Sequence, residues 1–288
     1  MKLGGFLPDS YWNTVTVRDK IYPGGDFMEL LADVGNTTTI FGLHNSKSVI
    51  CVWRLPSSRL ETEDEIFAIL DGLFRSKGFS FSSLDGFCVA SVVPRLNRSL
   101  QYFAARYLPF SAVFLKPDRF VSVGLKTDNP AEIGADRLAN VIGAARHYGP
   151  NAIVIDVGTA ITIDVLKDNV FVGGSILPGP ATAMSALFSK TAKLPEVELF
   201  FEDHYLGTNT EDNIRIGIVN GTYFALQGIV KNLQKNFSER TQVIGTGGNV
   251  ELFMIEDGFI DTNDQDLTLK GIRAYYDRVK ASEKSITG

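Results

Sequence analysis

The chain has 288 residues, of which 44% are hydrophobic and 21% charged, and its formal net charge is −5. This length is enough for a hydrophobic core and fits one large domain or two ordinary ones. The acidic balance offers no basic field to a nucleic-acid backbone, no apolar run approaches the ~20 residues of a membrane span, and the first residues lack the layout of a signal peptide. We therefore expect a cytoplasmic protein that binds neither nucleic acid nor membrane.

Residues 1–28 differ in character from the rest of the chain. Glycines and prolines punctuate this segment, and its scattered aromatic residues follow no sustained period. Met28 stands directly before the first strong strand signal, so the chain could equally begin there, with a leader upstream. We predict an N-terminal extension or leader at residues 1–28 and assign it no function.

Strands and helices alternate from Glu29 onward. The predicted strand regions are rich in apolar and β-branched residues and lie at 30–43, 48–55, 86–93, 152–166, 169–176 and 241–245. The predicted helices carry apolar residues at helical spacing and lie at 61–75, 96–107, 131–148, 182–188, 213–237 and 267–279. The first and fourth strand regions each contain a glycine turn and are therefore expected to be hairpins. This alternation predicts an α/β protein.

One segment of the sequence occurs twice. Asp156 follows Asp33 by 123 residues, and the eight-residue segments 33–40 and 156–163 agree at five positions, among them the Asp, the Gly and one Thr. Each copy follows an apolar strand. We infer two related domains that face each other across a cleft, and we place them at residues 29–150 and 151–280.

The repeated segment has the composition of a phosphate site. A carboxylate at a strand end can hold a cation or its waters, and the glycine after it lets backbone N–H groups approach an anion. In the first copy, Asn36 and the threonines 37–39 add short side-chain donors. The alternative is a polar hairpin whose Asp and Asn were selected for turn geometry alone. A single copy would leave both interpretations open, but the repetition favours the phosphate site.

A third motif lies at the expected start of the helix at 131–148. Asn129, Pro130 and Glu132 form a capping signature, and Gly134 interrupts the helix start. Asp136 and Arg137 follow, and adjacent helical residues point about 100° apart. Such a pair can present a base and an anion clamp to one small substrate, although a capped helix with a surface Asp and Arg is the alternative.

Several other chemistries lack their markers. There is no Gly-Lys dipeptide of a P-loop, no Gly-x-Gly-x-x-Gly after a strand, no Cys-x-x-Cys and no Gly-x-Ser-x-Gly. The histidines at 44, 147 and 204 have no metal-ligand spacing, and we interpret them as incidental. Cys51 and Cys88 lie in apolar runs and are expected to be reduced core thiols. Glycine turns also follow strands at 173–180 and 245–249, which alone is weak evidence of a site.

Taken together, these motifs resemble those of the type III pantothenate kinases, in the superfamily of acetate and sugar kinases, Hsp70 and actin. The resemblance is carried, in the family's order, by residues 33–37, Asn129-Pro130 with Glu132, 134–137, Asp156 with Gly158-Thr159 and Thr162, Gly173-Gly174 with Pro178-Gly179, 191–195 before Val197-Glu198, and 246–248. It spans roughly Leu30 to Arg273, and the Gly-Ala-Asp-Arg element separates this family from sugar kinases. Residues 1–28 lie outside it.

The resemblance implies a fold, an activity and partners. The fold is two ribonuclease-H-like domains, as in actin-like ATPases, and the chain is expected to form a homodimer. The activity is ATP-dependent phosphorylation of pantothenate to 4'-phosphopantothenate, the first step of coenzyme A biosynthesis. The implied cofactors are ATP with Mg²⁺ and a monovalent cation, K⁺ or NH₄⁺.

The resemblance also implies roles for single residues. The nucleotide phosphates are assigned to Asp33, Val34, Gly35, Asn36, Thr37, Thr38, Thr39, Ile40 and Thr159. Pantothenate is assigned to Gly134, Ala135, Asp136, Arg137 and Thr210. Asp136 is the expected proton acceptor and Asp156 the ligand of the monovalent cation. One position departs from the family, because Thr127 stands where members commonly carry a tyrosine that contacts pantothenate.

Two other classes remain as alternatives. Another small-molecule kinase or phosphohydrolase of the superfamily would share both hairpins but should lack Gly-Ala-Asp-Arg. A non-catalytic regulator on the same fold should have lost one of the motif carboxylates, yet Asp33, Asp136 and Asp156 are all present.

Overall fold

The computed structural model describes residues 28–45, 47–190, 195, 197–256 and 258–287. The predicted extension at 1–28 therefore lies outside the described residues, except for Met28. The chain divides into two compact units. The first unit consists of the described residues of Met1–Lys116, Gly134–Asp136 and Tyr275–Gly288, and the second consists of those of Pro117–Ile133 and Arg137–Ala274. The predicted domain boundaries, 29–150 and 151–280, stay a prediction.

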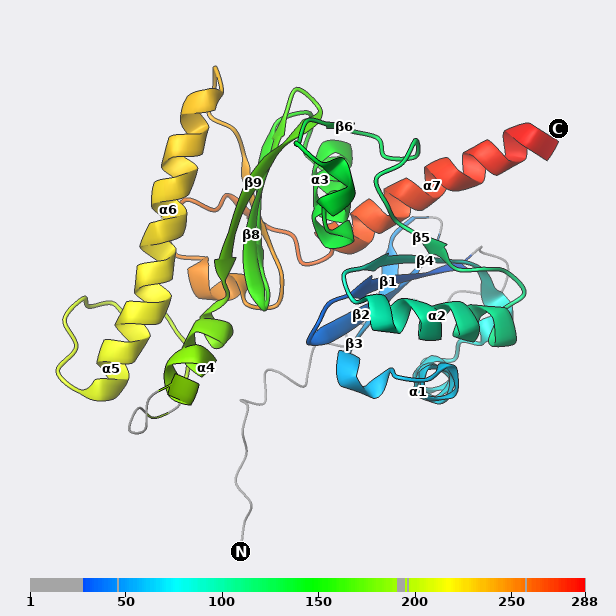
Figure 1. Ribbon diagram of the computed structural model, residues 1–288, viewed down its shortest axis with the longest axis horizontal. Coiled ribbons are helices and arrows are strands. Elements are labelled where there is room, and N and C mark those ends of the chain that lie inside the picture. Colours follow the sequence, from blue (N-terminus) through cyan, green and yellow to red (C-terminus); the bar gives the residue numbers. More distant parts are fainter. Residues whose placement is uncertain (1–27, 46, 191–194, 196, 257, 288) are drawn as a thin grey trace, which may run out of the picture. The chain divides into compact units, whose positions relative to one another are not determined.

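The first unit is built on a five-stranded sheet of order β3-β2-β1-β4-β5. Its strands are β1 Met28–Val34, β2 Thr38–His44, β3 Val49–Pro56, β4 Leu84–Ser91 and β5 Val113–Phe114. Strands β1 to β3 are antiparallel, whereas β4 pairs in parallel with both β1 and β5. Helices α1 (Glu63–Ser76) and α2 (Pro94–Tyr107) pack on the sheet (Figure 1). A capping box between Thr62 and Glu65 fixes the start of α1.

The core of the first unit explains why its strands read as apolar runs. Phe41 and Phe87 are fully buried beneath the helices, and Trp53 stacks on Phe74 of α1 with ring centroids 5.2 Å apart. Cys51 and Cys88 are buried free thiols, as predicted, and burial raises the pKa of the Cys51 thiol.

The second unit is built on a six-stranded sheet of order β11-β10-β7-β8-β9-β6. Its strands are β6 Gly124–Leu125, β7 Ala152–Val157, β8 Ala160–Lys167, β9 Val170–Pro178, β10 Val243–Thr246 and β11 Thr262–Asn263. Its helices are α3 Ala135–His147 from Arg137 onward, α4 Pro180–Lys190, α5 Thr210–Arg215 and α6 Gly221–Leu233, with a π-helical segment, Ile216–Asn220, between the last two. Helix α7 (Leu267–Thr287) begins in this unit. Helices α3 and α6 lie on opposite faces of the β8–β9 region (Figure 1).

The two sheets have the same topology. The order β3-β2-β1-β4-β5 of the first sheet corresponds to β9-β8-β7-β10-β11 of the second, with an antiparallel hairpin followed by parallel strands in each. The sequence repeat falls on the equivalent hairpins, β1–β2 and β7–β8. The predicted α/β class and the duplication are therefore confirmed.

Two predicted helices differ from the structure, and three short strands were not predicted. The helix expected at 131–148 begins only at Ala135, because Pro130–Glu132 forms a separate 3₁₀ turn that ends at the extended residue Ile133. The helix expected at 213–237 begins earlier, at Thr210, and is interrupted by the π-helical segment. The two-residue strands β5, β6 and β11 were not predicted, because two residues are too few to show an alternating pattern. Within the described part of the chain, no helix is long and apolar enough to cross a membrane.

Candidate active site

The turn of the first hairpin is exposed and closed by its glycine. Asp33 is half-buried near the end of β1, Val34 is buried, and Asn36, Thr37 and Thr38 are exposed. The N–H of Gly35 donates to the carbonyl of Thr38 at 3.0 Å. The predicted donors therefore lie directly beyond a carboxylate, as a phosphate cradle requires.

Ser57, which the sequence analysis missed, holds this turn from behind. It is fully buried and directly follows β3, its N–H donates to the carbonyl of Thr37 at 2.9 Å, and its hydroxyl donates to the carbonyl of Gly35 at 2.6 Å. The Thr39 hydroxyl lies 2.9 Å from Ser57 Oγ, and Thr39 is itself fully buried. Thr39 therefore turns its side chain into the interior, and Ile40 pairs with Asp33 across the ladder.

The second hairpin places Asp156 at the corresponding strand end. Asp156 is half-buried and lies opposite Thr162 in the β7–β8 ladder, and Thr159 is exposed in the turn. The N–H of Gly158 donates to the carbonyl of Ala160 at 3.0 Å. The buried Asn140 of α3 donates from Nδ2 to Asp156 Oδ2 at 2.9 Å, a contact that the sequence analysis did not foresee.

Both glycine turns noted in the sequence come to this strand end. Gly247 has a φ of +91°, and a Cβ added to it would lie 2.4 Å from Asp156 Oδ1, so only glycine fits there. Asn249 N–H donates to the carbonyl of Val157 at 3.0 Å. On the other side, Gly179 N–H donates to the carbonyl of Thr159 at 3.0 Å. The structure therefore brings three predicted segments together around the end of β7.

The Gly-Ala-Asp-Arg segment opens helix α3. Ala135 is its buried first residue, and a Cβ on Gly134 would lie 2.4 Å from Asp136 Oδ1. The missing Cβ of Gly134 thus makes room for the half-buried carboxylate. Asp136 belongs to the first compact unit and Arg137 to the second.

Arg137 is engaged by an internal carboxylate. Its Nε and Nη2 lie 2.7 and 2.6 Å from Oδ1 of Asp164, which is fully buried in β8 and also accepts from the Thr162 hydroxyl at 3.1 Å. The guanidinium also lies 5.4 Å from the centroid of the Phe171 ring. Asp164, another residue that the sequence analysis missed, therefore fixes the direction of Arg137.

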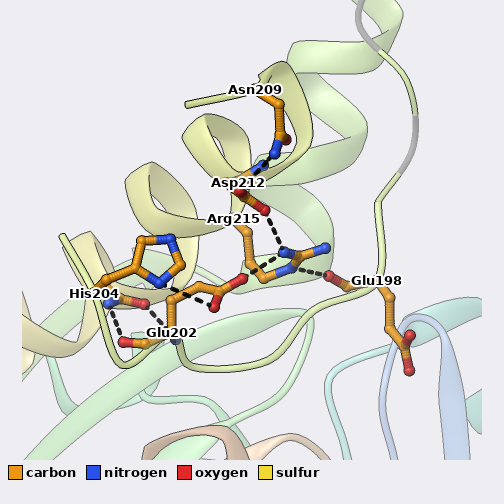
Figure 2. A network of polar contacts seen from close by, with 7 residues as sticks. Glu198, Glu202, His204, Asn209, Asp212 and Arg215 are labelled. Carbon is orange, nitrogen blue, oxygen red and sulfur yellow. Dashed lines mark hydrogen bonds and ion pairs between the residues drawn. The ribbon is translucent and has the colours of Figure 1, made fainter. Parts of the chain in front are cut away.

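Thr210, the other predicted pantothenate residue, is the exposed first residue of α5. Asn209 caps that helix by accepting from the N–H of Asp212 at 2.9 Å. Arg215 ties the helix to the segment before it, with ion pairs to Glu202 at 2.5 Å and Asp212 at 3.2 Å and a hydrogen bond to the carbonyl of Glu198 at 3.0 Å (Figure 2). An open hollow of about 480 Å³ beside Thr210 is lined by Pro195, Asn209, Thr210, Glu211 and Asp212.

Other predicted features are less informative. Residues 191–194 of the motif at 191–195 lie outside the described residues. No three His, Cys, Asp or Glu side chains gather into a metal-binding group within the described ranges. A Mg²⁺ ion that accompanies a nucleotide needs only one or two carboxylates, since phosphates and waters supply its other ligands. Asp33 is suited to that minimal role.

The architecture is shared with actin-like ATPases and sugar kinases. A candidate 2-dehydro-3-deoxygalactonokinase from Sinorhizobium meliloti superposes with a TM-score of 0.57 over 87% of this chain and 99% of its own, at 14% identity. MreB5 of Spiroplasma citri bound to AMPPNP superposes with a TM-score of 0.50 over 90% of this chain and 98% of its own, at 9% identity. These likenesses define the fold class that was predicted.

The sequence comparisons then identify the family. The profile of the type III pantothenate kinases matches residues 29–232. The type III pantothenate kinase of Kosmotoga olearia is 52% identical over 261 residues, which cover 91% of this chain and 100% of that protein. The enzyme of Fervidobacterium nodosum is 40% identical over 258 residues, 88% of this chain and 99% of that protein. The chain belongs to the type III pantothenate kinase family.

Proposed function

We propose that this chain transfers the γ-phosphoryl group of ATP to the primary hydroxyl of pantothenate and so begins coenzyme A biosynthesis in the cytoplasm. One observation carries the proposal. This chain, a member of the family, has the repeated Asp-Val-Gly hairpin at equivalent ends of two sheets and has Gly-Ala-Asp-Arg at the start of α3. The transition state of phosphoryl transfer is loose, so positioning and charge neutralisation do most of the work.

The two hairpins are assigned to the phosphates. The turn at residues 35–38 and Thr159 present short donors beside a carboxylate at each strand end. Asp33 would hold Mg²⁺ through its waters, and the metal, when bound, would neutralise charge on the phosphates. Backbone N–H groups of the turns would orient the nucleotide without adding a mobile charge.

Asp136 is the proposed proton acceptor. An alcohol hardly ionises at neutral pH, so a carboxylate placed against the hydroxyl takes its proton as the new P–O bond forms. Arg137 is assigned to the carboxylate of pantothenate, with Asp164 fixing its direction. Thr210 is assigned as a further pantothenate contact, supplied by the partner subunit of a homodimer.

Asp156 is assigned to the monovalent cation. The residues around it fit such a group, since its Oδ1 faces a glycine turn where a Cβ would come within 2.4 Å and its Oδ2 receives a neutral amide. K⁺ or NH₄⁺ at this carboxylate would offset the negative charge that collects where phosphates bind.

The test is ADP release with a panel of hydroxyl acceptors that includes pantothenate, with and without K⁺. We expect ADP release to depend on pantothenate, with phosphopantothenate as product. In Asp136→Asn, which keeps the shape and removes the base, turnover should fall by ~10²-fold or more while nucleotide binding survives. A preference for another acceptor would reject pantothenate as the substrate. Turnover of Asp136→Asn within a few-fold of wild type would reject Asp136 as the base.

A further inference from the structure

Asn140 is a residue of α3 whose side-chain amide is fully buried and has no role assigned in the proposed reaction. Its Nδ2 donates to Asp156 Oδ2 at 2.9 Å, and its Oδ1 accepts from the hydroxyl of Thr268 at 2.7 Å. Thr268 is also buried, in the first turn of α7. Two hydrogen bonds therefore connect α7 through α3 to the carboxylate at the end of β7.

The chemistry of the three groups fixes the direction of both bonds. An ionised carboxylate can only accept, so the NH₂ side of the Asn140 amide must face Asp156. Its Oδ1 then faces Thr268, whose hydroxyl can supply the required proton. The flipped amide would set two acceptors against each other at Asp156, so the network leaves one orientation.

The backbones of α3 and α7 are closely packed around these hydrogen bonds. A Cβ on Gly271 of α7 would lie 1.7 Å from the carbonyl oxygen of Ala139, and a Cβ on Gly143 would lie 2.6 Å from the carbonyl oxygen of Leu267. Helices α3 and α7 are thus in backbone contact beside Asn140 and Thr268. A side chain held in such a contact cannot relax when a neighbour changes.

A carboxylate that binds a cation through one oxygen is best held at its other oxygen by a neutral hydrogen-bond donor. A lysine or arginine in place of Asn140 would neutralise Asp156 and compete with a bound cation. An amide instead fixes the rotation of the carboxylate by holding Oδ2 and leaves its negative charge intact. Asp156 Oδ1 then lies on the side of the Gly247 turn.

We propose that Asn140, oriented by Thr268, is a positioning residue that fixes the Asp156 carboxylate for the monovalent cation. This inference rests on the proposed function, which assigns that cation to Asp156. It extends the cation site to a residue of α7 that lies 112 positions away from Asp156 in the sequence.

The test compares Asn140→Ala, Thr268→Val and Thr268→Ser with a matched control. The control is Asn220→Ala, because Asn220 is also buried in the second unit and makes two hydrogen bonds, to the backbone of Glu202. Two quantities are measured for each protein at constant ionic strength. One is the half-saturating K⁺ concentration for turnover, and the other is the rise in unfolding temperature when K⁺ replaces Na⁺ in the presence of ADP.

We expect Asn140→Ala to raise the half-saturating K⁺ concentration by roughly 10-fold or more and to lose most of the K⁺-dependent rise in unfolding temperature, as is typical when a partner of a metal ligand is removed. Thr268→Val should show a smaller shift of the same sign, and Thr268→Ser, which restores the hydroxyl, should return towards wild type. Asn220→Ala should lower the unfolding temperature without changing the response to K⁺.

Each failure has a separate meaning. If wild type responds to K⁺ but Asn140→Ala responds equally, or if Asn220→Ala shifts the response as much, the positioning role is overturned. Should Asn140→Ala fail to fold, an unchanged K⁺ response in Thr268→Val is by itself enough to overturn the positioning role. A wild type that phosphorylates pantothenate with no K⁺ response overturns both the cation assignment and this inference, whereas one that does not phosphorylate pantothenate overturns the proposed function.

Discussion

The hairpins β1–β2 and β7–β8 share a sequence but not a register. Asp33 lies opposite Ile40, whereas Asp156, at the same position of the repeat, lies opposite Thr162. The difference is one residue in the turn, since the last pair is Val34 with Thr39 in the first hairpin and Val157 with Ile161 in the second. Because side chains alternate between the faces of a sheet, one residue is enough to move every equivalent side chain of the second strand to the other face.

The shift gives the repeated threonine two different tasks. Thr39 turns into the core of the first unit and bonds to Ser57 beneath the turn at residues 35–38. Thr162 lies on the same face as Asp156 and donates to Asp164, which holds Arg137. The first hairpin is thus hydrogen-bonded to Ser57, directly after the third strand of its own sheet, while the second is connected through Asp164 to Arg137 of α3.

The largest expected effect comes from removing the carboxylate of each copy. Asp33→Asn and Asp156→Asn should each lower turnover by ~10²-fold or more, because each removes the charged ligand of a cation that would offset the negative charge of the phosphates. They should differ in ion dependence, with Asp33→Asn raising the Mg²⁺ requirement and Asp156→Asn abolishing the response to K⁺. Separate titrations of turnover with each ion check this. If both variants changed the Mg²⁺ and the K⁺ requirement in the same way, the assignment of Mg²⁺ to Asp33 and of K⁺ to Asp156 would be contradicted.

Asp164→Asn tests the connection between the second hairpin and Arg137. A neutral amide in place of the buried carboxylate weakens the charge-assisted bonds to Arg137, which should lower the free energy of unfolding by about 1.5–3 kcal/mol. It should also raise the KM for pantothenate by roughly 10-fold, because Arg137 loses its fixed direction. Denaturant unfolding and steady-state kinetics measure the two effects.

The control for Asp164→Asn is Phe41→Leu, because each residue directly follows its copy of the repeated segment. Phe41 is fully buried in the core. The substitution should cost about 1–2 kcal/mol of stability through lost packing. It should leave the KM for pantothenate unchanged. If both variants raise that KM alike, general loosening rather than the Asp164–Arg137 pair is responsible.

Ser57→Ala tests the support of the first hairpin by Ser57. Loss of the hydroxyl leaves the carbonyl of Gly35 and the Thr39 hydroxyl without this partner, which should cost about 1–3 kcal/mol. The KM for ATP should rise several-fold and that for pantothenate should not change. Ser99→Ala is the control, since Ser99 is a buried serine of the same unit that donates to the carbonyl of Glu61. An equal effect of Ser99→Ala on the KM for ATP would exclude a specific role for Ser57.

The sequence predicted the fold well because the fold rests on periodic and repeated features. Alternating strands and helices gave the α/β class, and the matching Asp-Val-Gly segments marked the equivalent hairpins of two sheets with one strand order. Register was out of reach, since an ungapped match of 33–40 with 156–163 implies equal turns. The difference is visible only in the structure, in the strand pairings and in the closing bonds from Gly35 to Thr38 and from Gly158 to Ala160.

The supporting residues could not be predicted from motifs, because each acts through a contact distant in sequence. Ser57 lies 22 residues from Gly35, and Thr268 lies 128 residues from Asn140. A signal existed for two others. Asp164 interrupts an apolar strand and Asn140 an apolar helix segment, and polar residues at core positions usually have a buried partner.

The smallest and sharpest comparison exchanges the two equivalent threonines for valine. Thr39→Val and Thr162→Val keep the side-chain shape and remove one hydroxyl each, so each should cost about 1 kcal/mol of stability. The bond that each loses is different, since Thr39 bonds to Ser57 and Thr162 to Asp164. Thr39→Val should therefore raise the KM for ATP slightly and leave pantothenate unaffected, and Thr162→Val should raise the KM for pantothenate a few-fold and leave ATP unaffected. Steady-state kinetics with each substrate varied in turn measure both. Were the two variants to change the same KM, the one-residue difference in register would have no functional consequence, and the hairpins would be equivalent after all.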